Sequence, residues 1–174
     1  MIKLGILENR VKIAYLGIGS NLGNRSKNID LTKFMLQSHN VQILRSSSKY
    51  ESESWPDRTM PKFINVIIKI KTDLSPVKLL AICNSIELSL GRKRSKKNDP
   101  RTCDIDIIDY DKKIIVIKNK PKLILPHVSM TKRNFVLLPL YEIDKSWKHP
   151  KTKVNITNLI NSLKIDDLTS IKQL

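Results

Sequence analysis

FINVIIKIKT, residues Phe63–Thr72, is a strong β-strand signal near the middle of the chain. β-Branched residues dominate it, and Lys69 and Lys71 fall on one face of an extended backbone. An earlier apolar run, KIAYLGIGS at Lys12–Ser20, has no helical stripe and ends in turn-forming residues. The two runs therefore predict two strands, of which the earlier one is buried.

The segment between these two strands predicts a helix and a weaker strand. Asn24 can cap a helix whose apolar positions continue to about residue 38. Residues 41–51 alternate weakly and are rich in Ser, as an edge strand is. Residues 52–62 have no periodicity and contain Trp55, which makes them a candidate functional loop.

The segments after Thr72 complete a regular order of elements. Ser75 and Pro76 start a second helix that Gly91 ends, and a strand covers about residues 102–110. The order β-α-β-β-α-β resembles the ferredoxin-like arrangement. We therefore expect an α+β fold, with an antiparallel-rich sheet and its two main helices packed on one face. An extended piece ending at His127 and helices near residues 133–142 and 155–163 form a C-terminal extension.

Composition bounds the class of protein. The chain has 174 residues, 40% of them hydrophobic, which suits one domain with a single core. Its net charge of +16 suits a partner that carries phosphates, such as nucleic acid, membrane lipid or a nucleotide. Because 24 of the 32 basic residues are Lys, a biased genome explains this charge as well as a selected basic surface does. Collagen, coiled coil and acidic disorder are excluded.

Two cysteines, Cys83 and Cys103, are too few for a disulfide framework, and neither lies in a Cys-x-x-Cys pair. The three histidines, His39, His127 and His149, are too scattered to indicate a zinc site. No apolar run approaches the ~20 residues that a membrane helix needs. We expect a cytoplasmic protein that does not bind a membrane.

Residues 102–108, TCDIDII, carry the clearest chemical signal. On a strand, Asp104 and Asp106 project to the same side, ~6.6 Å apart, while Cys103, Ile105 and Ile107 face the core. Two carboxylates at this spacing can hold one or two Mg²⁺ ions whose other ligands are water and phosphate oxygens. The alternative is a solvated strand face.

A cationic segment leads directly into this acid pair. Six of the eleven residues 91–101 are basic, and three of the eight arginines lie here: Arg92, Arg94 and Arg101. Metal-binding carboxylates beside arginines are what phosphoryl transfer requires, since Arg matches phosphate as a planar fork. A solvated loop is the alternative.

The run GIGSNLG at residues 17–23 differs from nucleotide-binding loops. Its third Gly is one residue late for the dinucleotide fingerprint, and no Gly-Lys-Ser/Thr follows. We interpret it as a set of turn glycines that pack the first strand against its helix.

Together these motifs resemble the 6-hydroxymethyl-7,8-dihydropterin pyrophosphokinase family, from about residue 13 to residue 147. Members transfer a pyrophosphoryl group from ATP to a pterin alcohol, releasing AMP, in folate biosynthesis. The matching motifs are Y15LGIGSNLG, F63IN, I86EL, G91RKR, P100RTCDIDI, P126H and R133NFVLLPL. The family's usual Arg-Trp-Gly-Pro-Arg is replaced by Asn98-Asp99-Pro100-Arg101. Residues 1–11 precede the family's usual start, so we expect an N-terminal extension and a single domain over residues 12–174.

The resemblance implies a role for each matching residue. Asp104 and Asp106 hold two Mg²⁺ ions, and the arginines at 92, 94 and 101 come from or border the loop over ATP. The ATP-side positions are Leu80, Asn84, Glu87, Ile107, His127 and Arg133. The pterin-side positions are Ser52, Trp55, Phe63, Asn65 and Phe135.

Two other functions compete with this interpretation. The charge alone favours a nucleic-acid-binding module, which explains neither the acid pair nor Asn65. The acid pair also suits another Mg²⁺-dependent nucleotidyl or phosphoryl transferase, because fold does not determine chemistry. We expect a monomer that binds ATP and the pterin and does not bind nucleic acid.

Overall fold

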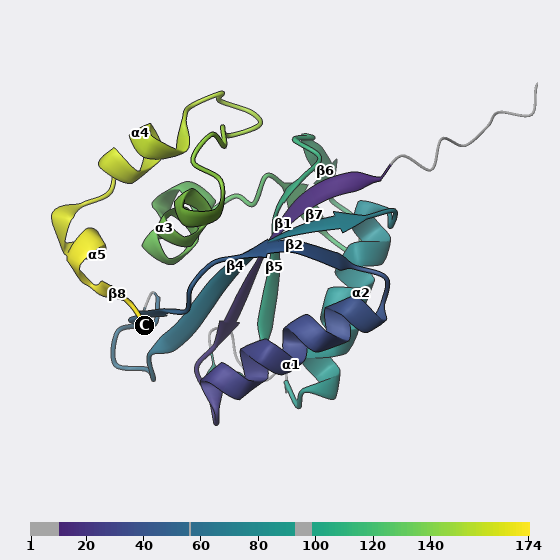
Figure 1. The fold of residues 1–174 in the computed structure, drawn as a ribbon, viewed down its shortest axis with the longest axis horizontal. Helices are drawn as coiled ribbons and strands as arrows, with labels where there is room; N and C mark the ends of the chain where they lie inside the picture. Colours follow the sequence, from purple (N-terminus) through teal and green to yellow (C-terminus); the bar gives the residue numbers. More distant parts are fainter. Residues whose placement is uncertain (1–10, 56, 93–98) are drawn as a thin grey trace, which may run out of the picture.

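The structure is a computed structural model that describes residues 11–55, 57–92 and 99–174 (Figure 1). Apart from residue 11, the expected N-terminal extension lies outside the described residues. A main sheet runs in the order β5-β1-β4-β3-β8, and β2 also pairs with β4. Its strands are β1 (Lys12–Ser20), β2 (Gln42–Ser46), β3 (Tyr50–Ser52), β4 (Phe63–Thr72), β5 (Asp104–Tyr110) and β8 (Ile171–Gln173). All pairs in this sheet are antiparallel.

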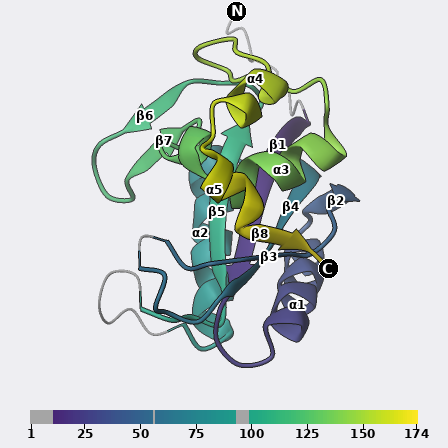
Figure 2. The same cartoon turned by 90° about the vertical axis from the view of Figure 1, so that its left-hand side faces the viewer.

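Helices cover both faces of the sheet (Figures 1 and 2). The helices α1 (Arg25–Ser38) and α2 (Pro76–Ser89) pack on one face, against alternate residues of β1, β4 and β5 such as Leu16, Ile68 and Ile105. On the opposite face, α3 (Asn134–Ile143) packs against β4, and α4 (Ile156–Asn161) packs on α3, in a core that includes Tyr15 and Ile67. The period of two along β1, β4 and β5 therefore supplies two cores from the same strands.

Smaller elements complete the chain. The strands β6 (Ile115–Ile117) and β7 (Leu123–Leu125) form a separate hairpin, and a short 3-10 helix, η1 (Met130–Lys132), precedes α3. The helix α5 (Ile165–Thr169) leads into β8. None of the helices in the described part of the chain has the length and apolar character needed to cross a bilayer.

The predicted α+β, ferredoxin-like architecture is confirmed. Both long strands have the bounds expected from their sequences. The caps are also those expected, since the side chain of Asn24 accepts from the Lys27 N–H and that of Ser75 accepts from the Lys78 N–H. Gly91, with φ +82°, follows α2 where a left-handed residue can end a helix.

Residues 41–51 form two short strands, so the prediction of one edge strand is wrong. Ser46 pairs with Ile68 and Tyr50 with Asn65, so four steps of this segment oppose three steps of β4. Residues 47–49 thus oppose only residues 66 and 67, and Ser47 both donates its N–H to the Ile67 carbonyl and accepts the Ile67 N–H on its hydroxyl. This β-bulge separates β2 from β3.

The interpretation of the glycine run as a turn set is also wrong for two of its members. Gly17 and Gly19 lie inside β1, on the face opposite α1 and α2. A Cβ on Gly19 would lie 3.1 Å from Asn65 Oδ1 and 3.3 Å from Phe63 Cδ1. Gly23, with φ +67°, is the member that makes a turn.

The C-terminal strand β8 and helix α5 were not predicted. β8 extends the sheet beyond β3, with Ser52 opposite Ile171 (Figure 2). Just before β8 in the chain, the Asp167 carbonyl and Ser170 Oγ accept hydrogen bonds from the buried Asn134 amide, the latter at 3.2 Å. These contacts attach the end of the chain to both β3 and the start of α3.

A carboxylate at the end of α3 joins that helix to the sheet. Asp144 Oδ2 accepts from the Tyr15 hydroxyl at 2.5 Å and from Lys69 Nζ at 3.0 Å. Burial by itself would raise the pKa of Asp144, but hydrogen bonds from Tyr15, Ser146 and Lys69 lower it to about 2. Since its folded pKa lies below the unfolded value of ~3.9, the carboxylate stabilises the fold above pH ~4.

We predict that Asp144→Asn lowers the free energy of unfolding at pH 7 by roughly 1–2 kcal/mol. The difference from wild type should narrow as the pH falls from about 4 to about 2, because protonation removes the same charge from the wild-type chain. Urea denaturation at a series of pH values measures this. The matched control is Asp166→Asn, which changes an exposed carboxylate on α5. A difference that does not vary with pH would contradict the assignment.

Candidate active site

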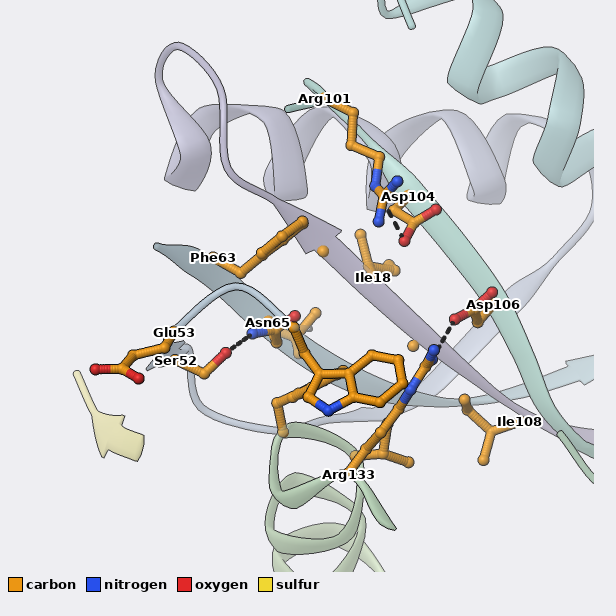
Figure 3. Close-up of a pocket in the computed structure, with 16 residues that line it drawn as sticks. Ile18, Ser52, Glu53, Phe63, Asn65, Arg101, Asp104, Asp106, Ile108 and Arg133 are labelled. Carbon is orange, nitrogen blue, oxygen red and sulfur yellow. Dashed lines mark hydrogen bonds and ion pairs between the residues drawn. The ribbon is translucent and has the colours of Figure 1, made fainter. Parts of the chain in front are cut away.

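A pocket opens on the sheet face that carries α3. Strands β1, β3, β4 and β5, the loop after β3, and the start of α3 contribute to it (Figure 3). It is lined by Gly17, Ile18, Gly19, Ser52, Glu53, Trp55, Phe63, Asn65, Val66, Arg101, Asp104, Asp106, Ile108, Arg133, Phe135 and Val136.

The acid pair has the alternation that the sequence predicts. Asp104 and Asp106 line the pocket, with side chains 25% and 39% exposed. Cys103, Ile105 and Ile107 are buried in the core on the α1 and α2 side. Both carboxylates are therefore accessible on one side of β5.

Basic side chains surround the two carboxylates. Arg92 Nη1 lies 2.7 Å from Asp104 Oδ1, and Arg101 Nε lies 3.3 Å from Asp104 Oδ2. Arg133 Nη1 lies 3.2 Å from Asp106 Oδ2 (Figure 3). His127 Nε2 lies 3.8 Å from the same oxygen. Arg94 lies outside the described residues.

The surroundings shift the pKa values of Asp104 and of His127. Burial and the neighbouring Asp106 carboxylate raise the pKa of Asp104, while Arg101 and Arg92 oppose the rise. Burial lowers the pKa of His127 despite the opposing charge of Asp106, so its imidazole is neutral at pH 7. The arginines are thus the cations of the pocket wall, because their guanidinium groups stay charged.

The two carboxylates and their surroundings suit a hard cation that also binds water and phosphate oxygens. Within the described residues, no group of three or more His, Cys, Asp or Glu side chains forms a complete metal site. The Nε–H groups of Arg101 and Arg133 are buried and have no hydrogen-bond partner in the described part of the chain. Two carboxylates with such donors beside them fit Mg²⁺, which takes few protein ligands and completes its shell with water and phosphate oxygens.

The five predicted pterin-side residues lie together in this pocket. Asn65 is buried and donates from Nδ2 to Ser52 Oγ at 2.9 Å. The Arg133 guanidinium lies 5.6 Å from the ring centres of Trp55 and of Phe135. These rings and the Asn65 amide line a partly polar cavity next to the acid pair, and ring faces with a few fixed polar groups suit a planar heterocycle.

Five predicted ATP-side residues are not in the pocket lining, and one of them, His127, lies at its edge beside Asp106. Glu87 is only 4% exposed, and its Oε1 accepts the Ile105 N–H at 2.7 Å and lies 2.5 Å from Arg92 Nη1. Ile107 is buried in the core that α2 covers, and Leu80 packs against the same core. Asn84 is half-buried on α2. Their contact with ATP stays a prediction.

The sequence did not identify the pocket floor. Gly19 pairs with Asp104 on one side and with Asn65 on the other, and Gly17 pairs with Asp106. Both glycines therefore lie between the acid pair and the pterin-side strand. The alternation of Gly17 and Gly19 along β1 was the available signal, but its meaning depends on which strands flank β1. Glu53 also lines the pocket, and no pattern singled it out.

Comparisons of this chain with known proteins all point to one family. A model of the 7,8-dihydro-6-hydroxymethylpterin-pyrophosphokinase (HPPK) family matches residues 15–145. The chain belongs to this family. The 2-amino-4-hydroxy-6-hydroxymethyldihydropteridine pyrophosphokinase of Haemophilus influenzae is 35% identical over 148 residues, covering 84% of this chain and 90% of that protein. Its Bacillus subtilis counterpart is 38% identical over 132 residues, covering 75% of this chain and 77% of that protein.

Other HPPK relatives are much longer. The folic acid synthesis protein fol1 of Pneumocystis carinii is 35% identical over 157 residues, which cover 90% of this chain and 21% of that protein. The chain thus spans about a fifth of that relative. A crystal structure of wild-type HPPK-DHPS from Plasmodium falciparum has the same fold, with a TM-score of 0.73 at 18% identity. It covers 93% of this chain and 47% of that one.

In this member of the HPPK family, we predict that Glu87 supports the fold beneath the acid pair. Glu87→Ala would leave the Ile105 N–H unpaired and remove a partner of Arg92. We expect it to lower the free energy of unfolding by about 2–4 kcal/mol, measured by urea denaturation. Unchanged stability combined with weaker ATP binding would instead assign the carboxylate to the nucleotide.

Proposed function

We propose that this chain transfers pyrophosphate from ATP to the hydroxymethyl group of 6-hydroxymethyl-7,8-dihydropterin and releases AMP, as a step of folate biosynthesis. The observation that carries the proposal is one pocket in which the acid pair and its arginines adjoin Asn65 and three aromatic rings. The same pocket can therefore hold a phosphate chain next to a flat heterocycle. Membership of the HPPK family supports the same activity.

On the phosphate side, we assign two Mg²⁺ ions to Asp104 and Asp106. When bound, the metal would neutralise the negative charge of the phosphates and the charge that develops during transfer. The Nε–H groups of Arg101 and Arg133 are buried next to the two carboxylates and have no hydrogen-bond partner among the described residues, so these can donate to phosphate oxygens. Arg92 and Arg94 complete the proposed set of phosphate-binding arginines.

On the pterin side, Phe63, Trp55 and Phe135 offer faces and edges for the bicyclic ring. The Asn65 side chain keeps an acceptor and a second donor hydrogen, since Ser52 takes only one of its hydrogen bonds. The nucleophile is the hydroxyl of the substrate. This hydroxyl releases its proton to water, its oxygen bonds to the β-phosphorus of ATP, and the bond from this phosphorus to the oxygen of the α-phosphate breaks, which leaves AMP. The work of the protein is alignment and charge stabilisation.

The two competing functions receive no support from the fold or from the relatives. The described arginines of the pocket are paired with carboxylates, so the net charge of the chain is not concentrated there. We further propose that the protein acts as a cytoplasmic monomer and binds neither nucleic acid nor membranes. Both cysteines are buried free thiols, which suits a reducing compartment.

The decisive test is mass spectrometry of the products from ATP, Mg²⁺ and the pterin alcohol. We expect AMP and the pyrophosphorylated pterin in equal amounts, whereas ADP would exclude pyrophosphoryl transfer. Asp106→Asn should lower kcat by about 100-fold or more, because an amide is a poor Mg²⁺ ligand. The thermal melting temperature should remain close to wild type, since the side chain is 39% exposed. Full activity of this variant would remove Asp106 from the metal site.

Gly19 provides a test of the pterin side. In Gly19→Ala the new methyl group would press on Asn65 and on Phe63. Overpacking of this kind costs ~1–3 kcal/mol, so we expect the KM for the pterin to rise about 10-fold while the KM for ATP changes little. In the comparison variant, Gly17→Ala, the atoms nearest to the methyl belong to the side chains of Ile67 and Ile108 rather than to Asn65 or Phe63, and a smaller effect is expected. Equal effects of the two variants on the pterin KM would contradict this prediction.

A further inference from the structure

A buried amide side chain outside the pocket lining connects two segments of the pocket wall. Asn21 follows β1 directly and is only 3% exposed. Its backbone N–H donates to the Arg101 carbonyl at 3.1 Å, and its Oδ1 accepts the Arg101 N–H at 2.8 Å. One asparagine thus holds both backbone polar groups of a residue 80 positions later in the chain.

The other half of the same amide faces the loop after β3. Asn21 Nδ2 donates to the Pro61 carbonyl at 3.1 Å and lies 3.5 Å from Ser54 Oγ. Ser54 is itself buried, and its hydroxyl donates to the Pro61 carbonyl at 2.6 Å. This hydrogen-bonded group closes the base of the loop that presents Trp55 to the pocket.

The two segments held by Asn21 carry the two halves of the proposed chemistry. Arg101 belongs to the phosphate side, where its Nε lies 3.3 Å from Asp104 Oδ2. Its guanidinium also lies 5.5 Å from the centre of the Phe63 ring, which belongs to the pterin side. Ser54 and Pro61 belong to the pterin-side loop. A shift in either segment is therefore transmitted to the other through one side chain.

We infer that Asn21 is a positioning residue that couples the phosphate-side segment at Arg101 to the pterin-side loop at residues 54–61. The inference rests on the proposed function for its kinetic consequences. Asparagine suits the role because its acceptor and donors lie at opposite sides of one planar group. Its acceptor holds the Arg101 N–H, while its donors hold the loop. Small displacements matter here, since misplacement of a reacting group by ~1 Å can cost about 100-fold in rate.

Two substitutions separate the two connections. Asn21→Ala removes both, and we expect kcat to fall about 10-fold or more and the KM for the pterin to rise by a similar factor. Asn21→Asp keeps the acceptor for the Arg101 N–H but loses the donors to the loop. It should raise the KM for the pterin with a smaller loss of kcat. A purely structural residue would not produce this split between kcat and KM.

The matched control is Asn28 on α1, whose side chain contacts the same turn. Asn28 Nδ2 donates to Ser20 Oγ at 3.2 Å and to the Leu22 carbonyl at 2.9 Å, on either side of Asn21. Among the described residues, its side chain makes no hydrogen bond to either pocket segment, so Asn28→Ala tests loss of turn packing alone. We expect it to leave kcat and both KM values within about 2-fold of wild type, as for a change with no contact to the reacting groups.

A double-mutant cycle tests whether Asn21 acts through Arg101. If it does, the kcat effect of Asn21→Ala should largely disappear in an Arg101→Ala background, while the effect on the pterin KM should persist. In a Ser54→Ala background, the effect of Asn21→Ala on the pterin KM should largely disappear, while its effect on kcat should persist. Additive effects in both backgrounds would overturn the inference, as would Asn21 variants that behave like Asn28→Ala. Ser54→Ala and Asn21→Asp remain informative if Asn21→Ala does not fold.

Hydrogen–deuterium exchange supplies a readout that does not depend on activity. Asn21→Ala should increase exchange at residues 57–62 and 99–102 together, whereas Asn28→Ala should not. If the wild-type protein releases no AMP but exchange rises in both segments, the proposed function fails and the coupling stands. If the wild type is active and exchange in both segments is unchanged, the coupling fails and the function stands.

Discussion

The site depends on the backbone register of three antiparallel strands. Because β1 lies between β5 and β4, Gly19 faces Asp104 on one side and Asn65 on the other. A slip of one residue would turn every side chain to the opposite face of the sheet. The acid pair would then enter the core that α1 and α2 cover, and Ile105 and Ile107 would face the pocket. Burial of these apolar side chains therefore holds the carboxylates in place.

The arginines at the pocket form ion pairs with neighbouring carboxylates. Arg92 lies between Glu87 and Asp104, and Arg133 reaches Asp106 from the start of α3. Removing Glu87 from Arg92 is costly, because the guanidinium is partly buried and loses part of its compensation. This arrangement explains why the net charge of +16 describes the pocket poorly. The arginines there are matched by carboxylates, and most of the excess charge belongs to lysines elsewhere in the chain.

Much of the fold could be predicted because its signals are local. The composition of β1 and β4 and the caps Asn24 and Ser75 each depend on a few adjacent residues, and all are present as predicted. The division of residues 41–51 was missed because it arises from the pairing of Ser47 with Ile67, on another strand. The strand β8 has only three residues and exists through its pairing with β3, so no periodic pattern could reveal it.

The candidate site likewise combines features that a local pattern predicts with features that depend on contacts between distant segments. The sequence by itself determined that Asp104 and Asp106 share a face, because alternation is a property of the extended backbone. It also determined that arginines precede them and that the chain resembles its family. Only the tertiary structure decided that Glu87 lies beneath β5, that Gly17 and Gly19 form the pocket floor, and that Asn21 joins Arg101 to Ser54. These relations depend on strand register and on hydrogen bonds between segments far apart in the chain, which no local pattern encodes.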